Sequence, residues 1–194
     1  MTDHKSSAAG EFSDQVRLFA DRISQSSAPA LSGLYDLTAQ RLVRYATTVT
    51  GNQHDAEDAV QAALVNVAGH PSLLAQSSQP WSYLLRMVRN EALVILRKKK
   101  RWSLVANLSD LLTRRLVDEV EREDMHRAVW VALRSLPTEQ SEVVVLKIWE
   151  ELTFAQIADV LELSPSTAAS RYRYAIAKLT EKLRVGAELE VHLD

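Results

Sequence analysis

Apolar residues recur along most of the chain three or four positions apart, which is the spacing of one face of an α-helix. No segment alternates strictly between apolar and polar residues for long, as a half-buried β-strand would. The pattern predicts helices over about residues 34–50, 54–68 and 81–99, and a shorter one within the first thirty residues. Their expected buried residues are Phe12, Val16, Phe19, Ile23, Leu42, Tyr45, Ala46, Val49, Val60, Ala63, Leu64, Val67, Trp81, Leu84, Val88, Ala92 and Ile95. The predicted fold class is therefore all-α.

The second half of the chain carries the pattern of a helix-turn-helix. Thr153 and Gln156 have the spacing of a capping box, at the start of a short helix that ends by Leu161. Ser164 and Pro165 then supply an N-cap and a first-turn residue for the last long helix. The expected apolar stripe of that last helix is Ala168, Tyr172, Ala175, Leu179 and Leu183.

The opposite face of the last helix carries the short hydroxyl residues Ser166 and Ser170 near its start. Arg173 follows one turn further on, with Tyr174 beside it. Hydroxyl and backbone N–H groups suit phosphate contacts, and arginine reaches base edges in the major groove. The pattern favours a DNA-recognition helix. A helical hairpin whose basic face is merely solvated is the alternative.

Composition narrows the classes of function. The chain of 194 residues is long enough for one ordinary domain or two small ones. Five glycines and five prolines are too few for a turn-rich β sandwich, and no glycine-rich phosphate loop is present. Cysteine is absent, and the five histidines lack metal-ligand spacing. We therefore expect a non-enzymatic protein with no metal and no cofactor. Because the chain has no long apolar run, we also expect a soluble, cytoplasmic protein without membrane insertion.

The net charge of −2 hides segments of opposite sign. Residues 31–105 have an excess of four positive charges, whereas residues 137–194 have an excess of four negative charges. Within that acidic half, residues 166–184 hold five basic residues against Glu181 alone. A second basic arc lies opposite the apolar stripe of the helix over residues 81–99, and it is formed by Arg86, Arg89, Asn90 and Arg97 with the basic run that follows to Arg101. Two basic patches on an acidic background predict contact with a polyanion at two places.

Asn90 and the aromatic residues near the start of this helix are candidates for contact with an unpaired base. Trp81, however, lies on the apolar stripe, which favours a core position over a stacking platform.

Two sets of motifs resemble the sigma-70 family of initiation factors. The string Asp55-Ala-Glu-Asp-Ala-Val-Gln61, followed by the segment from Pro80 to Asn90 and the basic run, resembles region 2 of that family. The segments 136–143 and 152–163, with Ser170-Arg171, resemble region 4. Because only these two regions are present, with a short linker, the chain resembles the extracytoplasmic-function (ECF) group.

This resemblance implies two small helical domains in a non-catalytic subunit of bacterial RNA polymerase. The expected organisation is a partly disordered N-terminal extension (1–30), region 2 (31–103), a linker (104–126), region 4 (127–184) and an acidic tail (185–194). In the family, region 2 binds the polymerase core and melts the minus-ten promoter element, and region 4 reads the minus-thirty-five duplex. The implied partners are the polymerase core and promoter DNA, with an anti-sigma factor as a further candidate.

The resemblance also assigns residues to roles. The polymerase-facing set is Asp55, Asp58, Gln61, Ala62 and Val65. The set for the opened minus-ten strand is Arg86, Arg89, Asn90, Arg97 and Lys98. The set for the minus-thirty-five duplex is Ser166, Thr167, Ser170, Arg171, Arg173, Tyr174 and Lys178.

The chain departs from the family pattern at two turns. Glu151 and Glu162 stand where the family commonly has glycine, so both turns are expected to form without a residue that adopts left-handed backbone freely. Two other functions stay open at this point. One is a stand-alone helix-turn-helix regulator, and the other is a sigma-mimicking module that occupies a partner protein.

Overall fold

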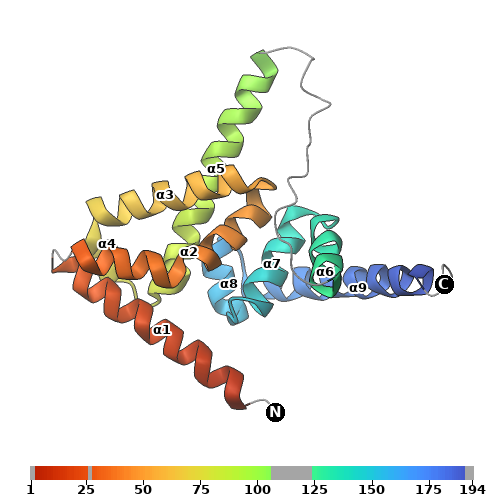
Figure 1. The fold of residues 1–194 in the computed structure, drawn as a ribbon, viewed down its shortest axis with the longest axis horizontal. Coiled ribbons are helices and arrows are strands. Elements are labelled where there is room, and N and C mark those ends of the chain that lie inside the picture. Colours follow the sequence, from red (N-terminus) through yellow and green to blue (C-terminus); the bar gives the residue numbers. More distant parts are fainter. Residues whose placement is uncertain (1–2, 26–27, 106–123, 191–194) are drawn as a thin grey trace. The chain divides into compact units, whose positions relative to one another are not determined.

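The computed structural model describes residues 3–25, 28–105 and 124–190. These residues form nine α-helices and no β-strand, which confirms the all-α prediction (Figure 1). They belong to two compact units. The first contains helices α1 to α5, and the second contains α6, α7, α9 and the start of α8.

The first unit is built around helix α2. Its helices are α1 (Asp3–Ser24), α2 (Ala28–Thr50), α3 (Gln53–Gly69), α4 (Pro71–Ala75) and α5 (Pro80–Val105). Helix α2 packs against α1, α3 and α5, and α3 also packs against α5. The side chains that fill the space between them include Leu34, Leu42, Tyr45, Val60, Leu84, Leu85 and Val88. Most of the positions expected from the apolar stripes are buried, although Phe12, Phe19 and Ile95 are only half-buried.

The turn between α2 and α3 follows from its two residues. Gly51 has a φ of +68°, a left-handed conformation that glycine adopts without a steric penalty. Asn52 is the N-cap of α3, and its side-chain oxygen accepts a hydrogen bond of 3.0 Å from the backbone N–H of Asp55. Together they end one helix and begin the next within two residues.

Helix α1 is an integral part of the first unit. Val16, Ala20 and Ile23 are buried along one face, and the helix packs against α2, α4 and α5. Its approach to α2 is close at Gly33, where an added Cβ would lie 2.4 Å from the ring of Phe19. The expected helix in the first thirty residues therefore forms and contributes to the core.

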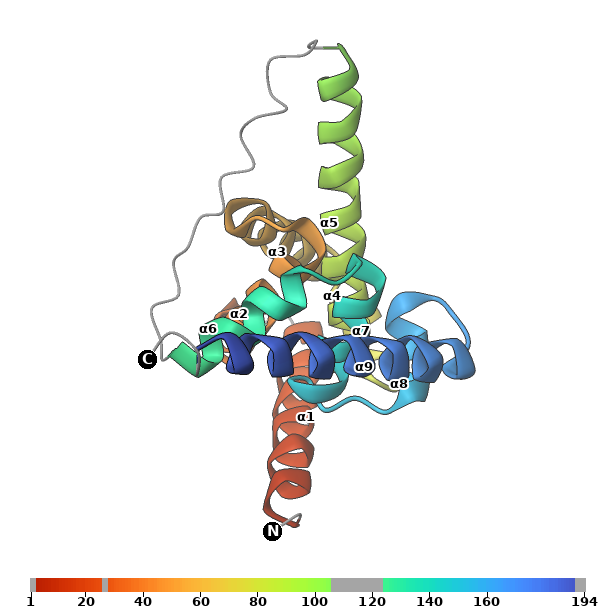
Figure 2. The same cartoon turned by 90° about the vertical axis from the view of Figure 1, so that its right-hand side faces the viewer.

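The second unit contains α6 (Asp124–Arg134), α7 (Thr138–Ile148), the start of α8 (Phe154–Leu161) and α9 (Pro165–Glu190). Helix α9 packs against α6 and α7 (Figure 2). Its core is formed by Ala132, Leu133, Leu136, Val144, Ala175 and Leu179. Leu183, the last member of the expected stripe, is 37% exposed, because the stripe runs beyond the packed part of α9. Most of the linker expected at 104–126 lies outside the described residues, as do the last residues of the tail.

The two turns that flank α8 contain the residues singled out from the sequence. Glu151 and Glu162 have φ values of 56° and 57°, and among the described residues other than glycine they are the positions with positive φ. A left-handed conformation costs a residue with a Cβ roughly 1–2 kcal/mol. Both turns therefore adopt the geometry that glycine would allow at lower cost.

Candidate functional site

The helix-turn-helix begins with the predicted capping box. The backbone N–H of Thr153 donates to Oε1 of Gln156 at 2.9 Å, and the backbone N–H of Gln156 donates to Oγ1 of Thr153 at 3.2 Å. Ser164 caps the next helix, since its Oγ accepts from the backbone N–H of Thr167 at 3.1 Å. These contacts fix where α8 and α9 begin.

Helix α8 is also held by a residue that the sequence analysis did not single out. Lys147 donates from Nζ to the backbone oxygen of Leu152 at 3.0 Å, and Nζ lies 5.1 Å from the centroid of the Phe154 ring. That ring packs edge-on against Tyr172 of α9 at 5.7 Å. A lysine in the last turn of α7 is the only sequence signal for this role, and it is a weak one.

The exposed face of α9 carries most of the residues assigned to duplex DNA. Ser166, Thr167, Arg173, Tyr174 and Lys178 are exposed, and Ser170 is half-buried. Their spacing puts them along one side of the helix. Arg173 donates to Oγ of Ser170 at 3.3 Å, and Tyr174 is 68% exposed. This face therefore presents hydroxyl groups at the helix N-terminus and cationic groups one to three turns further on.

Arg171 lies differently from the other residues of its set. Its Nη2 is 2.8 Å from Oε2 of Glu139 in α7, and its side chain is only 31% exposed. The pair links α9 to α7. Arg171 therefore has a positioning contact within the second unit, whatever it contributes to DNA.

Helix α5 presents the second basic face. Asn90, Arg97 and Lys98 are exposed, whereas Arg86 and Arg89 are half-buried. The guanidinium of Arg86 lies 5.1 Å from the centroid of the Tyr83 ring, a distance that allows a cation–π contact. Trp81 is buried, as its place on the apolar stripe predicted. The far end of α5 runs past the rest of the unit, and residues 97–101 are all exposed.

Helix α3 presents an outward face with an apolar centre. Asp58, Gln61, Ala62 and Val65 are exposed, and Val65 keeps 72% of its surface in solvent. Ala62 and Val65 lie three positions apart on the helix, so they form a small apolar patch among polar residues on this face.

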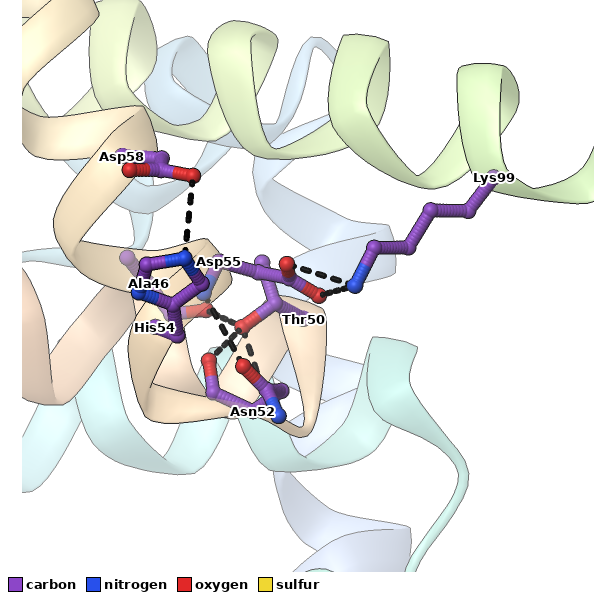
Figure 3. Close-up of polar contacts among 7 residues, drawn as sticks. All are labelled: Ala46, Thr50, Asn52, His54, Asp55, Asp58 and Lys99. Atoms are coloured by element: carbon purple, nitrogen blue, oxygen red, sulfur yellow. Dashed lines mark hydrogen bonds and ion pairs between the residues drawn. The ribbon is translucent and has the colours of Figure 1, made fainter. Parts of the chain in front are cut away.

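Asp55 does not lie on this outward face. It is buried, and both of its carboxylate oxygens lie 2.6 Å from Nζ of Lys99 in α5 (Figure 3). The pair ties the start of α3 to the basic end of α5. Asp55 is therefore withdrawn from the surface, and Lys99 of the basic run is paired within the first unit.

Two family models match the chain, one in each unit. The model of Sigma-70 region 2 matches residues 34–102, and the model of Sigma-70, region 4 matches residues 126–184. Together they cover well over half of the chain and include both candidate DNA faces. The chain belongs to the sigma-70 family.

Relatives of this sigma factor place it in the ECF group. It is 29% identical over 155 residues to the ECF RNA polymerase sigma factor SigL of Mycobacterium tuberculosis, covering 78% of this chain and 88% of SigL. It is 29% identical over 147 residues to the RNA polymerase sigma-E factor of Streptomyces avermitilis, covering 73% of this chain and 78% of the relative.

Solved structures share the fold of this sigma factor. CnrH, solved in complex with the cytosolic domain of CnrY, gives a TM-score of 0.63 at 21% identity, covering 88% of this chain and 98% of CnrH. The sigma factor RpoE of Bartonella quintana, solved in complex with the anti-sigma factor NepR, gives a TM-score of 0.61 at 22% identity, with coverages of 79% and 96%.

No group of three or more His, Asp or Glu side chains in the described part of the chain is placed to hold a metal ion. Among the helices that the structure describes, none combines the length and the apolar character needed to cross a membrane.

Proposed function

We propose that this ECF sigma factor binds the RNA polymerase core through α3 and directs initiation by contacting promoter DNA with α5 and α9. The observation that carries the proposal is the combination, within one chain, of a helix face with an exposed apolar centre at Ala62 and Val65 and two separate basic helix faces. A protein that only occupied a partner would not need both basic faces, and a stand-alone regulator would not need the apolar one.

The α9 face supports duplex recognition at the minus-thirty-five element. Arg173 is the residue best placed to read a base edge, because it is exposed on the face that would enter the major groove. Ser166 and Thr167 lie at the helix N-terminus, where hydroxyl and backbone N–H groups bind phosphate. Lys178 lies further along the helix and would add phosphate attraction.

The α5 face supports contact with the opened minus-ten strand. Arg97 and Lys98 would bind phosphates, and Asn90 is exposed to hydrogen-bond an unpaired base. Arg86 and Arg89 are half-buried nearer the start of the helix, where they would meet the strand close to the body of the unit. We assign Lys99 a structural role, because it is paired with Asp55.

The polymerase contact is tested by placing a charge in the apolar centre of the α3 face. Val65→Asp is expected to weaken binding of the full chain to purified bacterial core polymerase at least about tenfold, because the contact would bury an unpaired carboxylate. The matched control is Leu18→Asp, which puts the same charge on an exposed apolar position of α1. Equal affinities for the two variants would contradict the assigned face.

The same binding measurement distinguishes a sigma factor from a stand-alone regulator. If the full chain fails to bind core yet binds a specific duplex tightly without it, the regulator is the correct function. We further infer that the protein is not an enzyme and that it acts in the cytoplasm, where its partners, RNA polymerase and promoter DNA, are. An anti-sigma factor is a proposed third partner, since RpoE and its anti-sigma factor form such a pair.

A further inference from the structure

The connection between α4 and α5 is held by a residue far away in the sequence. Arg17 of α1 donates from Nη1 to the backbone oxygen of Ala75 at 3.2 Å, and from Nη2 to the backbone oxygen of Ser78 at 2.7 Å. These partners lie 58 and 61 residues further along the chain. One guanidinium therefore bridges the end of α4 and the turn that leads into α5.

The Ala75 carbonyl accepts from outside its own helix, and the Ser78 carbonyl lies in the exposed turn that follows. Ala75 ends a helix of five residues, and carbonyls in the last turn of a helix lack an intrahelical donor. A helix this short also contributes little stability of its own. The connector from Ala75 to Pro80 is held by local hydrogen bonds, among them those from the backbone N–H of Gln79 to Oγ of Ser77 and from the backbone N–H of Ser77 to the oxygen of Leu74, and by Arg17 from α1.

Helix α1 also contacts the other side of the connector. The ring of Phe12 packs edge-on against Trp81, the second residue of α5, with centroids 4.9 Å apart. The guanidinium of Arg41 in α2 lies 3.8 Å from the Phe12 centroid and 5.4 Å from that of Trp81. The connector is thus held on the α4 side by Arg17 and on the α5 side by Phe12.

We propose that Arg17 is a positioning residue for strand binding: it fixes the connector and, through it, the first turns of α5. The inference rests on the proposed function of α5, because Tyr83, Arg86 and Asn90 follow directly after the connector. Arg17 and Phe12 both precede residue 34, where the match to Sigma-70 region 2 begins. Promoter opening therefore depends on a helix outside the matched region.

The test compares Arg17→Ala with Arg22→Ala, an exposed arginine on the same helix, and with the conservative Arg17→Lys. Hydrogen exchange of the full chain is measured at residues 76–83, where the backbone N–H of Tyr83 donates to the oxygen of Gln79. Arg17→Ala is expected to accelerate exchange there about tenfold or more, because two charge-assisted hydrogen bonds are lost. Exchange in α2 and α3 is expected to stay unchanged. Arg22→Ala is expected to leave the connector unchanged, and Arg17→Lys is expected to restore part of the protection.

A second readout uses purified core polymerase and a fork-junction DNA taken from a promoter that the wild-type holoenzyme transcribes. Arg17→Ala is expected to keep the wild-type affinity for core and to bind the fork junction about tenfold more weakly, in line with the same lost bonds. Unchanged exchange at 76–83, or an equal loss of core and fork affinity, would overturn the inference. Failure of the wild-type protein to bind core would instead overturn the proposed function, while the exchange experiment would still decide what Arg17 does.

Discussion

At the scale of single residues, the Asp55–Lys99 pair shows how a charge assigned to a partner can belong to the fold. A carboxylate removed from water is costly unless a cation and hydrogen bonds compensate it. Lys99 supplies the cation from α5, while Asn52 and Asp55 begin α3. The pair joins the helix proposed to meet polymerase to the helix proposed to meet DNA.

Removing Lys99 is therefore expected to destabilise the first unit. Lys99→Ala leaves the buried carboxylate of Asp55 without its cation, and we expect the free energy of unfolding to fall by about 1–2 kcal/mol, less than for a fully buried pair because Lys99 is 60% exposed. Native-state hydrogen exchange of α3 amides measures this. Lys98→Ala is the matched control, an exposed neighbour in the same run. Equal effects of the two substitutions would show that the pair contributes nothing.

Glu151 and Glu162, whose backbone is left-handed, lead to the opposite prediction: a substitution that raises the free energy of unfolding. Glu162→Gly relieves the Cβ strain at a φ of 57° and is expected to raise the free energy of unfolding of the second unit by about 1 kcal/mol. The same substitution at Glu181, an exposed position in α9, should lower it by about 0.5–1 kcal/mol, because glycine weakens a helix interior. Urea unfolding of the two variants checks both signs, and destabilisation by Glu162→Gly would mean that its side chain has a stabilising role.

At the scale of elements, we expect different residues of α9 to recognise bases and to attract phosphates. Arg173→Ala is expected to cost about 1–3 kcal/mol of affinity for the selected minus-thirty-five duplex and to relax base preference at one position. Lys178→Ala should weaken binding to all sequences and lower the salt slope by about 1. Fluorescence anisotropy measures the binding of each variant holoenzyme to the minus-thirty-five duplex and to a duplex of scrambled sequence, and so distinguishes the two effects. If both variants lose affinity equally on every sequence, Arg173 is not a reader.

Elements and their caps could be predicted from the sequence because their causes are local. The capping box at Thr153 and Gln156, the Ser164 cap and the buried stripes all depend on residues within one or two turns. The faces of α5 and α9 could be predicted for the same reason. The sequence could not predict which charges on those faces are already paired with other residues of the chain. Lys99 of α5 meets Asp55 across 44 residues and Arg171 of α9 meets Glu139 of α7, and such contacts depend on tertiary packing.

At the scale of the whole molecule, the weak net charge of −2 is the sum of a basic first unit and an acidic second one. Phosphate attraction to the free chain should therefore be modest, because only local faces are basic. We expect the chain alone to bind its promoter at least about a hundredfold more weakly than the holoenzyme does, since polymerase adds the benefit of holding both units on one DNA. Gel shifts with and without core measure this ratio, and equal affinities would favour a stand-alone regulator.

The central claim is that this chain gives RNA polymerase its choice of promoter. The most direct test is in vitro transcription of genomic DNA from the same bacterium by purified core polymerase, with and without the protein, with mapping of transcript 5′ ends. We expect a defined set of start sites that depends on the protein and shares two upstream sequence elements. Identical start sites with and without the protein would contradict it.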